Sequence, residues 1–201
     1  DPERATVPPA PCWESDTIAL CVVDREGRAV SLIQSLYHSF GSGLVAAGIV
    51  LHNRGACFVL DERSPNVLAP GKRPLHTLIP AMALRDGRPW AVFGTMGGHS
   101  QPVIHLQLLT GLVDFDFEPQ EAVEAPRWVS RHEPGEAVET VYLEPALAER
   151  AAAELRRLGH RVEVTEPFSS LMGHAHLIVF GDDGVLRGGS DPRAEGCALG
   201  W

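Results

Sequence analysis

Several short apolar segments, bounded by glycine, proline or aspartate, predict β-strands along the chain. Residues 17–24 and 28–36 are two such segments. Asp24–Gly27 between them is a hairpin signal, because its glycine tolerates a positive φ. Residues 44–52 predict a third strand, and the uncharged run 78–84 predicts a buried one. Further strands are expected at 90–95, 138–143, 161–165 and 175–180, with tight turns at Asp86-Gly87 and Asp182–Gly184.

The spacing of apolar residues changes to a helical period in three segments. After Gly97-Gly98, apolar residues recur at a period close to that of an α-helix, which predicts a helix beginning there. Residues 118–125 predict a short helix that ends before Pro126. Residues 145–158 predict a third helix, with proline in its first turn, arginines in its last and Gly159 as its C-cap. Strand hairpins, then helices, then strands indicate an α+β fold in which helices pack on a sheet.

Composition and charge narrow the classes of function. The chain has 201 residues, 44% of them hydrophobic, which is enough for the core of one globular domain. A formal net charge of −9 without any basic block argues against nucleic acid or an anionic membrane as partner. No apolar run reaches the roughly 18 residues of a membrane-spanning helix. Four cysteines without C-x-x-C spacing predict neither a disulfide framework nor a zinc site; they favour a reducing, cytoplasmic location without determining it.

The first sixteen residues differ from the rest of the chain. They begin at Asp1 without a methionine, contain four prolines and show little apolar periodicity. This composition is typical of a linker or of the tail of an upstream segment. We therefore expect residues 1–16 to be a linker and the chain to be a piece of a longer protein.

Taken singly, the polar motifs identify no site. His174 and His176 would share one face of a strand and could both contact a metal, but no third ligand is near, so ordinary polar packing is favoured. Gly97-Gly98, between a strand and a helix, would leave backbone N–H groups free for an anion or oxyanion, or would simply form a tight turn. Ser190–Pro192 is interpreted as a turn. No cofactor or metal is predicted.

The order of seven short motifs is more informative than any one of them. From Thr17 to Trp201 the chain resembles the small, catalytic subunit of the γ-glutamyltransferase (γ-glutamyltranspeptidase) family. The resemblance implies an N-terminal nucleophile hydrolase with an αββα four-layer sandwich, made as a precursor that cleaves itself before a threonine and pairs with a large subunit. The motifs are TIALCVVD (17–24), GRAVSLIQSL (27–36), FGSG (40–43), PGKRPLHT (70–77), GTMGG (94–98), EAPRW (124–128) and GGSDPR (188–193).

The resemblance assigns catalytic roles to four residues. It implies that the Asp16–Thr17 bond is cleaved and that Thr17 becomes the nucleophile, with its own free amine as base. This is chemically reasonable, because a hydroxyl nucleophile needs an adjacent base. Ser35 stands where the family carries a second threonine that hydrogen-bonds the nucleophile. Gly97 and Gly98 match the glycine pair whose N–H groups form the oxyanion hole. Thr17 would otherwise be an ordinary strand-start threonine, and Ser35 an ordinary strand residue.

The chain departs from the family at the positions that bind the γ-glutamyl group. Tyr37, Arg54 and Cys57 stand where the family places partners for the α-ammonium, and His76 and Thr77 replace the paired serines for the α-carboxylate. Arg54 would repel an ammonium group. We therefore expect a preserved catalytic centre and a rebuilt substrate pocket, as in the divergent branch of the family. Arg54, His76 and Thr77 are predicted to bind another, acidic acyl group; alternatively they only pack the pocket wall.

Three functional hypotheses follow. The first is a threonine amidohydrolase or acyltransferase that acts on γ-glutamyl or related small amides through an acyl-enzyme. The second is an amidase that resembles glutaryl or cephalosporin acylases. The third is a non-catalytic module that is truncated or never processed.

Overall fold

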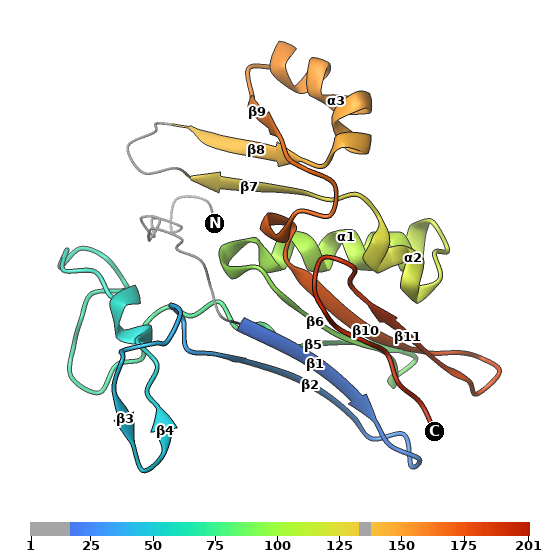
Figure 1. The fold of residues 1–201 in the computed structure, drawn as a ribbon, viewed down its shortest axis with the longest axis horizontal. Helices are drawn as coiled ribbons and strands as arrows, with labels where there is room; N and C mark the ends of the chain where they lie inside the picture. Colours follow the sequence, from blue (N-terminus) through green and yellow to red (C-terminus); the bar gives the residue numbers. More distant parts are fainter. Residues whose placement is uncertain (1–16, 133–137) are drawn as a thin grey trace.

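A β-hairpin opens the part of the chain that the computed structural model describes, residues 17–132 and 138–201 (Figure 1). Its strands are β1 (Thr17–Val23) and β2 (Ala29–Ser35), antiparallel in a register that pairs Thr17 with Ser35. In the turn, Asp24 Oδ1 accepts hydrogen bonds from two backbone N–H groups and Gly27 has a φ of 80°. The predicted hairpin is confirmed. The predicted linker, residues 1–16, lies outside the described residues.

A four-stranded antiparallel sheet forms the centre of the molecule, in the order β11-β10-β6-β5. The tight turns predicted at Asp86-Gly87 and Asp182–Gly184 join neighbouring strands of this sheet. Asp86, Gly87 and Gly184 have the positive φ angles that such turns need. The strands are β5 (Ala81–Arg85), β6 (Arg88–Met96), β10 (His174–Phe180) and β11 (Leu186–Ser190).

Two predicted strands are corrected. The segment 78–84 was expected to be a buried strand, but β5 begins only after Pro80 and lies half-exposed at the sheet edge, where it pairs on one side alone. The segment 44–52 was expected to be one strand. It is a small hairpin of β3 (Val45–Ala46) and β4 (Ile49–Val50), because Ala47 and Gly48 both adopt positive φ and reverse the chain.

The β1–β2 hairpin packs against one face of the central sheet. A Cβ atom at Gly94 of β6 would lie only 3.4 Å from the Ala19 Cβ atom and from Ile33 Cδ1. Ser31 Oγ donates a hydrogen bond of 2.8 Å to the carbonyl of Phe93, which ties the two layers together. The small residues at this contact let the two layers approach closely.

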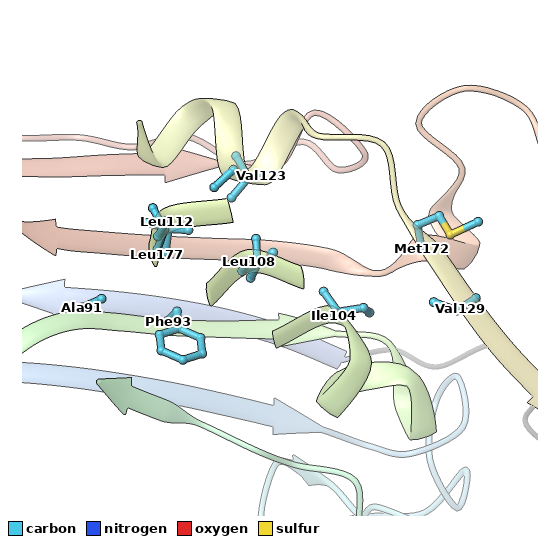
Figure 2. Packing of buried hydrophobic residues seen from close by; sticks show 11 residues of the cluster. Ala91, Phe93, Ile104, Leu108, Leu112, Val123, Val129, Met172 and Leu177 are labelled. Atoms are coloured by element: carbon cyan, nitrogen blue, oxygen red, sulfur yellow. The ribbon is translucent and has the colours of Figure 1, made fainter. Parts of the chain in front are cut away.

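Helices cover the opposite face of the central sheet. These are α1 (Gln101–Asp114), which follows the 3₁₀ turn Gly98–Ser100, and α2 (Pro119–Glu124), both close to their predicted positions. Figure 2 shows the main core between them and the sheet: Ile104, Leu108 and Leu112 of α1 lie beside strand residues. The other residues of this core are Ala91, Phe93, Ala122, Val123, Val129, Met172, Ala175 and Leu177.

A smaller unit of three strands and one helix completes the described structure. Strands β7 (Trp128–His132) and β8 (Glu139–Leu143) are antiparallel, and β9 (Arg161–Val164) runs parallel to β8 after the crossover helix α3 (Pro145–Arg157). Helix α3 and strands β8 and β9 agree with the sequence predictions. Strand β7 was not predicted, because its five residues WVSRH show no distinctive pattern and gain strand structure by pairing with β8.

The α+β class is confirmed, with three layers among the described residues: the β1–β2 hairpin, the central sheet and the pair α1 and α2 (Figure 1). The fourth, outer helical layer of the predicted sandwich has no counterpart in residues 17–132 and 138–201. Instead, the outer face of the hairpin leaves five aliphatic side chains exposed. These side chains are Ile18, Leu20, Val22, Val30 and Leu32.

Among residues 17–132 and 138–201, no helix is both long and apolar enough to cross a membrane.

Candidate active site

Two hydroxyl groups meet where β1 begins and β2 ends. Thr17 is 8% exposed, and its Oγ1 donates a hydrogen bond of 2.9 Å to Ser35 Oγ. The antiparallel register brings these residues opposite each other. Ser35 Oγ also accepts a hydrogen bond of 2.9 Å from the backbone N–H of Tyr37. The predicted nucleophile and its predicted partner are therefore in contact, with the Thr17 hydroxyl held in one orientation.

The glycine pair lies at the same end of the sandwich, in the loop from β6 to α1 (Figure 1). Gly97 has a φ of 153°, and a Cβ atom there would come within 2.7 Å of Ile104 Cδ1, so a larger residue would be strained at this position. Gly98 has a φ of 55° and open space on its Cβ side. Among the described residues neither N–H group has an acceptor, which leaves both available to a negatively charged oxygen.

Three of the five predicted pocket residues are in contact. The Arg54 guanidinium lies 4.4 Å above the centre of the Tyr37 ring, and its NH1 donates a hydrogen bond of 3.4 Å to Thr77 Oγ1. Cys57 is buried and shares the 3₁₀ turn Arg54–Cys57 with the arginine. His76 is different, since its side chain is exposed beside Thr77.

Two histidines near this end of the molecule, His99 and His174, have lowered pKa values. Partial burial lowers the pKa of His99, and the positive charges of Arg54 and Arg131 lower it further. Burial is also the main reason for the lowered pKa of His174. His176 Nδ1 lies 3.3 Å from Ser190 Oγ, which is the polar packing favoured by the sequence. Residues 17–132 and 138–201 contain no cluster of three or more metal-ligating side chains.

The arrangement of Thr17, Ser35 and the glycine pair has the parts that acyl transfer requires: a positioned hydroxyl nucleophile and free backbone donors for an oxyanion. Comparison with known proteins agrees. Residues 5–201 match the model of the gamma-glutamyltranspeptidase family. The chain belongs to this family. The resemblance seen in the seven sequence motifs is thereby confirmed.

Several members of the gamma-glutamyltranspeptidase family resemble the chain over most of its length. The oxamate amidohydrolase proenzyme of Klebsiella pneumoniae is 47% identical over 189 residues, covering 92% of this chain and 36% of the relative. The glutathione hydrolase-like YwrD proenzyme of Bacillus subtilis is 43% identical over 188 residues, with the same coverages. The crystal structure of cephalosporin acylase from Bacillus halodurans superposes with a TM-score of 0.81 at 38% identity, covering 91% of this chain and 34% of the acylase. The chain thus spans about a third of the length of these relatives.

A buried network of ion pairs was not predicted from the sequence of this member of the gamma-glutamyltranspeptidase family. Arg127 and Arg193 both pair with Asp191, at 2.6 and 3.0 Å, and Arg193 also pairs with Glu144. All four side chains are almost fully buried. Ser190–Pro192 is therefore more than the predicted turn. The signal was present in the motifs EAPRW and GGSDPR, which contain three of the four charged residues, but their pairing depends on the fold.

The network supports the loop beside the glycine pair. Arg127 NH1 donates hydrogen bonds of 3.3 Å to the carbonyls of Met172 and Gly173. The Gly173 Cα lies 3.7 Å from the position of a Cβ at Gly97. Burial lowers the pKa of Arg127, opposed by Asp191. Burial also lowers the pKa of Arg193, but bonds to Glu144 and the charge of Asp191 outweigh it, so this pKa lies above its ordinary value.

Proposed function

We propose that this chain is the catalytic small subunit of an amidohydrolase or acyltransferase, released when a precursor cleaves itself between Asp16 and Thr17. The observation that carries the proposal is the hydrogen bond of 2.9 Å between Thr17 and Ser35, at the end of the sandwich that also holds Gly97 and Gly98. Two relatives that are named proenzymes support it, since the chain aligns with only about a third of each. In this proposal residues 1–16 are the end of the large subunit and residues 17–201 are the small subunit.

The proposed mechanism uses one hydroxyl twice. In the precursor, Thr17 Oγ1 attacks the carbonyl carbon of Asp16, and the peptide C–N bond breaks as the nitrogen takes up the proton lost by the hydroxyl, which leaves an ester and frees the Thr17 amine. Water then hydrolyses this ester, which releases the Asp16 carboxylate and restores the Thr17 hydroxyl. In the mature protein this amine removes the proton from Oγ1 as the oxygen attacks the carbonyl carbon of an amide substrate. The N–H groups of Gly97 and Gly98 stabilise the negative oxygen of the tetrahedral intermediate. The C–N bond then breaks, and the leaving amine takes the proton from the Thr17 ammonium.

The acyl-enzyme is an ester of Thr17. Attack by water on this ester releases the carboxylic acid and completes hydrolysis, whereas attack by a second amine forms a new amide and completes transfer. Ser35 orients the Thr17 oxygen for its attack on the amide through the hydrogen bond between the two hydroxyls. No cofactor or metal takes part in this scheme.

The large subunit is the proposed partner. The exposed aliphatic face of the β1–β2 hairpin is unusual for the outside of a soluble protein, because Ile18, Val22 and Val30 are each more than half exposed. We propose that helices of the large subunit cover this face, which would complete the αββα four-layer sandwich.

A second candidate function is that of an acylase for amides that lack a γ-glutamyl group. Arg54 favours it, because a buried arginine stands at a position where the family resemblance implies an acceptor for an α-ammonium group. The names of the relatives span both candidates, from glutathione hydrolase-like proteins to oxamate amidohydrolase and cephalosporin acylase.

Intact-mass spectrometry of the full-length protein tests the proposal. The wild type is expected to yield a fragment that begins at Thr17, and T17A is expected to remain one uncleaved chain without amidase activity, since one hydroxyl serves both reactions. T17S is the matched control, because it keeps a hydroxyl and should still be cleaved. A wild type that stays uncleaved would support the non-catalytic module, and a cleaved, active T17A protein would show that another residue is the nucleophile.

A further inference from the structure

Arg54 is a buried cation without an anionic partner among the residues that the structure describes. Three arginines in the described part of the chain are less than 10% exposed: Arg54, Arg127 and Arg193. The other two each pair with a buried carboxylate within 3.0 Å. Among residues 17–132 and 138–201, no carboxylate lies within ion-pair distance of Arg54. Because burying an unpaired charge is unfavourable, a buried arginine of this kind indicates a missing anion.

Most hydrogen-bond donors of Arg54 have no acceptor in the described part of the chain. A guanidinium has five N–H donors in a planar fork that matches the two oxygens of a carboxylate. Within the described residues, the Arg54 side chain makes one hydrogen bond, of 3.4 Å, to Thr77 Oγ1. The Thr77 hydroxyl accepts this bond and still has its own proton to donate. Arg54 and Thr77 together therefore provide a guanidinium and a hydroxyl for one carboxylate.

The Arg54 side chain rests on a strained aromatic residue. Tyr37 has a φ of 77°, in the left-handed region that bulky residues rarely adopt. Its ring lies under the guanidinium and stacks on the ring of His38, with 4.5 Å between centroids. Strained backbone of this kind persists where the surrounding structure enforces it and is concentrated at functional sites.

The same tyrosine connects the cation to the nucleophile. The Tyr37 N–H donates to Ser35 Oγ, which in turn accepts the hydrogen bond of Thr17. Tyr37 therefore contacts both the Arg54 guanidinium and the Ser35 hydroxyl, and so links the arginine to the hydroxyl pair. Two positive charges also act on the residue after Gly98, since Arg54 and Arg131 both contribute to lowering the pKa of His99.

Resting on the proposed acyl transfer by Thr17, we infer that Arg54 and Thr77 bind a free carboxylate on the acyl group of the substrate. The substrates are then monoamides of dicarboxylic acids. An acyl group that also carries an α-ammonium is disfavoured, because the guanidinium repels it. A neutral acyl group of the same length leaves the buried charge of Arg54 unpaired.

The test compares two substrates that differ only in the carboxylate. In the full-length protein, kcat/KM is measured for glutaryl-p-nitroanilide and for butyryl-p-nitroanilide. R54Q is expected to lower the glutaryl value roughly 10- to 100-fold, the usual effect of losing hydrogen bonds to a charged group, and to change the butyryl value about twofold or less. R54K, which keeps the charge but not the fork, should recover part of the loss. The wild type should prefer glutaryl- to γ-glutamyl-p-nitroanilide.

A matched control removes a different positive charge from the segment between β4 and β5, which also contains Arg54. Arg63 is exposed and pairs with Asp61 at 2.9 Å, so R63Q should leave the kinetics of both substrates unchanged. If R54Q lowers kcat/KM equally for both substrates, Arg54 stabilises the structure instead, for example by pairing with a carboxylate of the large subunit. That result, or an unchanged glutaryl value, would overturn the inference while the proposed function stands.

Calorimetric titration with glutarate separates the two proposals, because it needs no turnover. The wild type is expected to bind glutarate and R54Q to lose that binding, whether or not the Asp16–Thr17 bond has been cleaved. A protein that is not cleaved but binds glutarate through Arg54 contradicts the proposed function alone. Equal binding by wild type and R54Q, or no binding by the wild type, contradicts the inference about Arg54.

Discussion

At the scale of single residues, the contact between Thr17 and Ser35 depends on serine retaining a hydroxyl group. Ser35 Oγ accepts two hydrogen bonds of 2.9 Å, from Thr17 Oγ1 and from the Tyr37 N–H. It therefore orients the proposed nucleophile and also holds the strained tyrosine under Arg54. One small side chain thus links the proposed nucleophile to the proposed substrate pocket.

Substituting Ser35 tests this double role. In S35A both hydrogen bonds lose their acceptor, and each is of a kind that contributes about 0.5–1.5 kcal/mol. We expect kcat/KM to fall roughly 5- to 100-fold and self-cleavage to slow. S35T keeps the hydroxyl and should restore most of the activity. Cleavage rates followed by intact mass and steady-state kinetics measure both effects, and wild-type rates in S35A would refute the orienting role.

At the scale of elements, α1 packs a histidine into the core it shares with β6. His105 is 7% exposed, lies edge-on to the Phe93 ring and has no hydrogen-bond partner for its buried Nε2 atom among the described residues. Burial lowers its pKa to about 4. Helix α1 therefore carries a neutral imidazole where an aliphatic residue would pack without a polar group.

This histidine should make stability depend on pH. The unfolded chain binds a proton near pH 6.5 and the folded chain only near pH 4, so protonation favours unfolding as the pH falls between these values. The loss could reach about 3 kcal/mol below the lower value. In H105L this part of the pH dependence should disappear. Thermal unfolding midpoints of wild type and H105L near pH 8 give the baseline, since His105 is neutral there in both states. Near pH 5 the unfolding midpoint of H105L should rise relative to that of the wild type. A difference between the two midpoints that stays constant with pH would contradict the prediction.

At the scale of the whole molecule, the buried ion network joins parts that are distant in sequence. Arg193 donates to the carbonyls of Val123 and Ala125 at the end of α2, and Glu144, at the start of α3, accepts from the backbone N–H of Arg127. Asp191 accepts a hydrogen bond from the N–H of Ala175 in β10. The network therefore fastens the three-stranded unit and the C-terminal segment to the central sandwich.

Neutralising one carboxylate should weaken this assembly. D191N leaves Arg127 without its ion-pair partner, and Arg127 is 1% exposed, so we expect a loss of about 3–5 kcal/mol in the free energy of unfolding. D183N is the matched control, because Asp183 lies near the same strand, β11, but pairs with Arg187 at the surface. Its loss should be small. Chemical denaturation measures the free energy of unfolding of both variants. If D191N is as stable as D183N, the network contributes little to stability.

The sequence by itself determined the elements with strong local signals. The β1–β2 hairpin, the three helices and the glycine turns follow from apolar period, caps and positive-φ residues, which act within a few positions of the chain. The ordered motifs also identified the family and named Thr17, Ser35, Gly97 and Gly98 as candidates. The catalytic roles of these four residues remain predictions.

The tertiary structure alone decided which groups meet. The short β3–β4 hairpin and strand β7 have weak local signals and depend on pairing, and β5 is half-exposed because it occupies the edge of the sheet. The ion network has the same origin, since Glu144 lies 49 residues from Arg193. The sequence could name Arg54 as a candidate pocket residue, but its burial, and the lack of a counter-charge among the described residues, appear only once the chain has folded, because burial is a property of packing between distant segments.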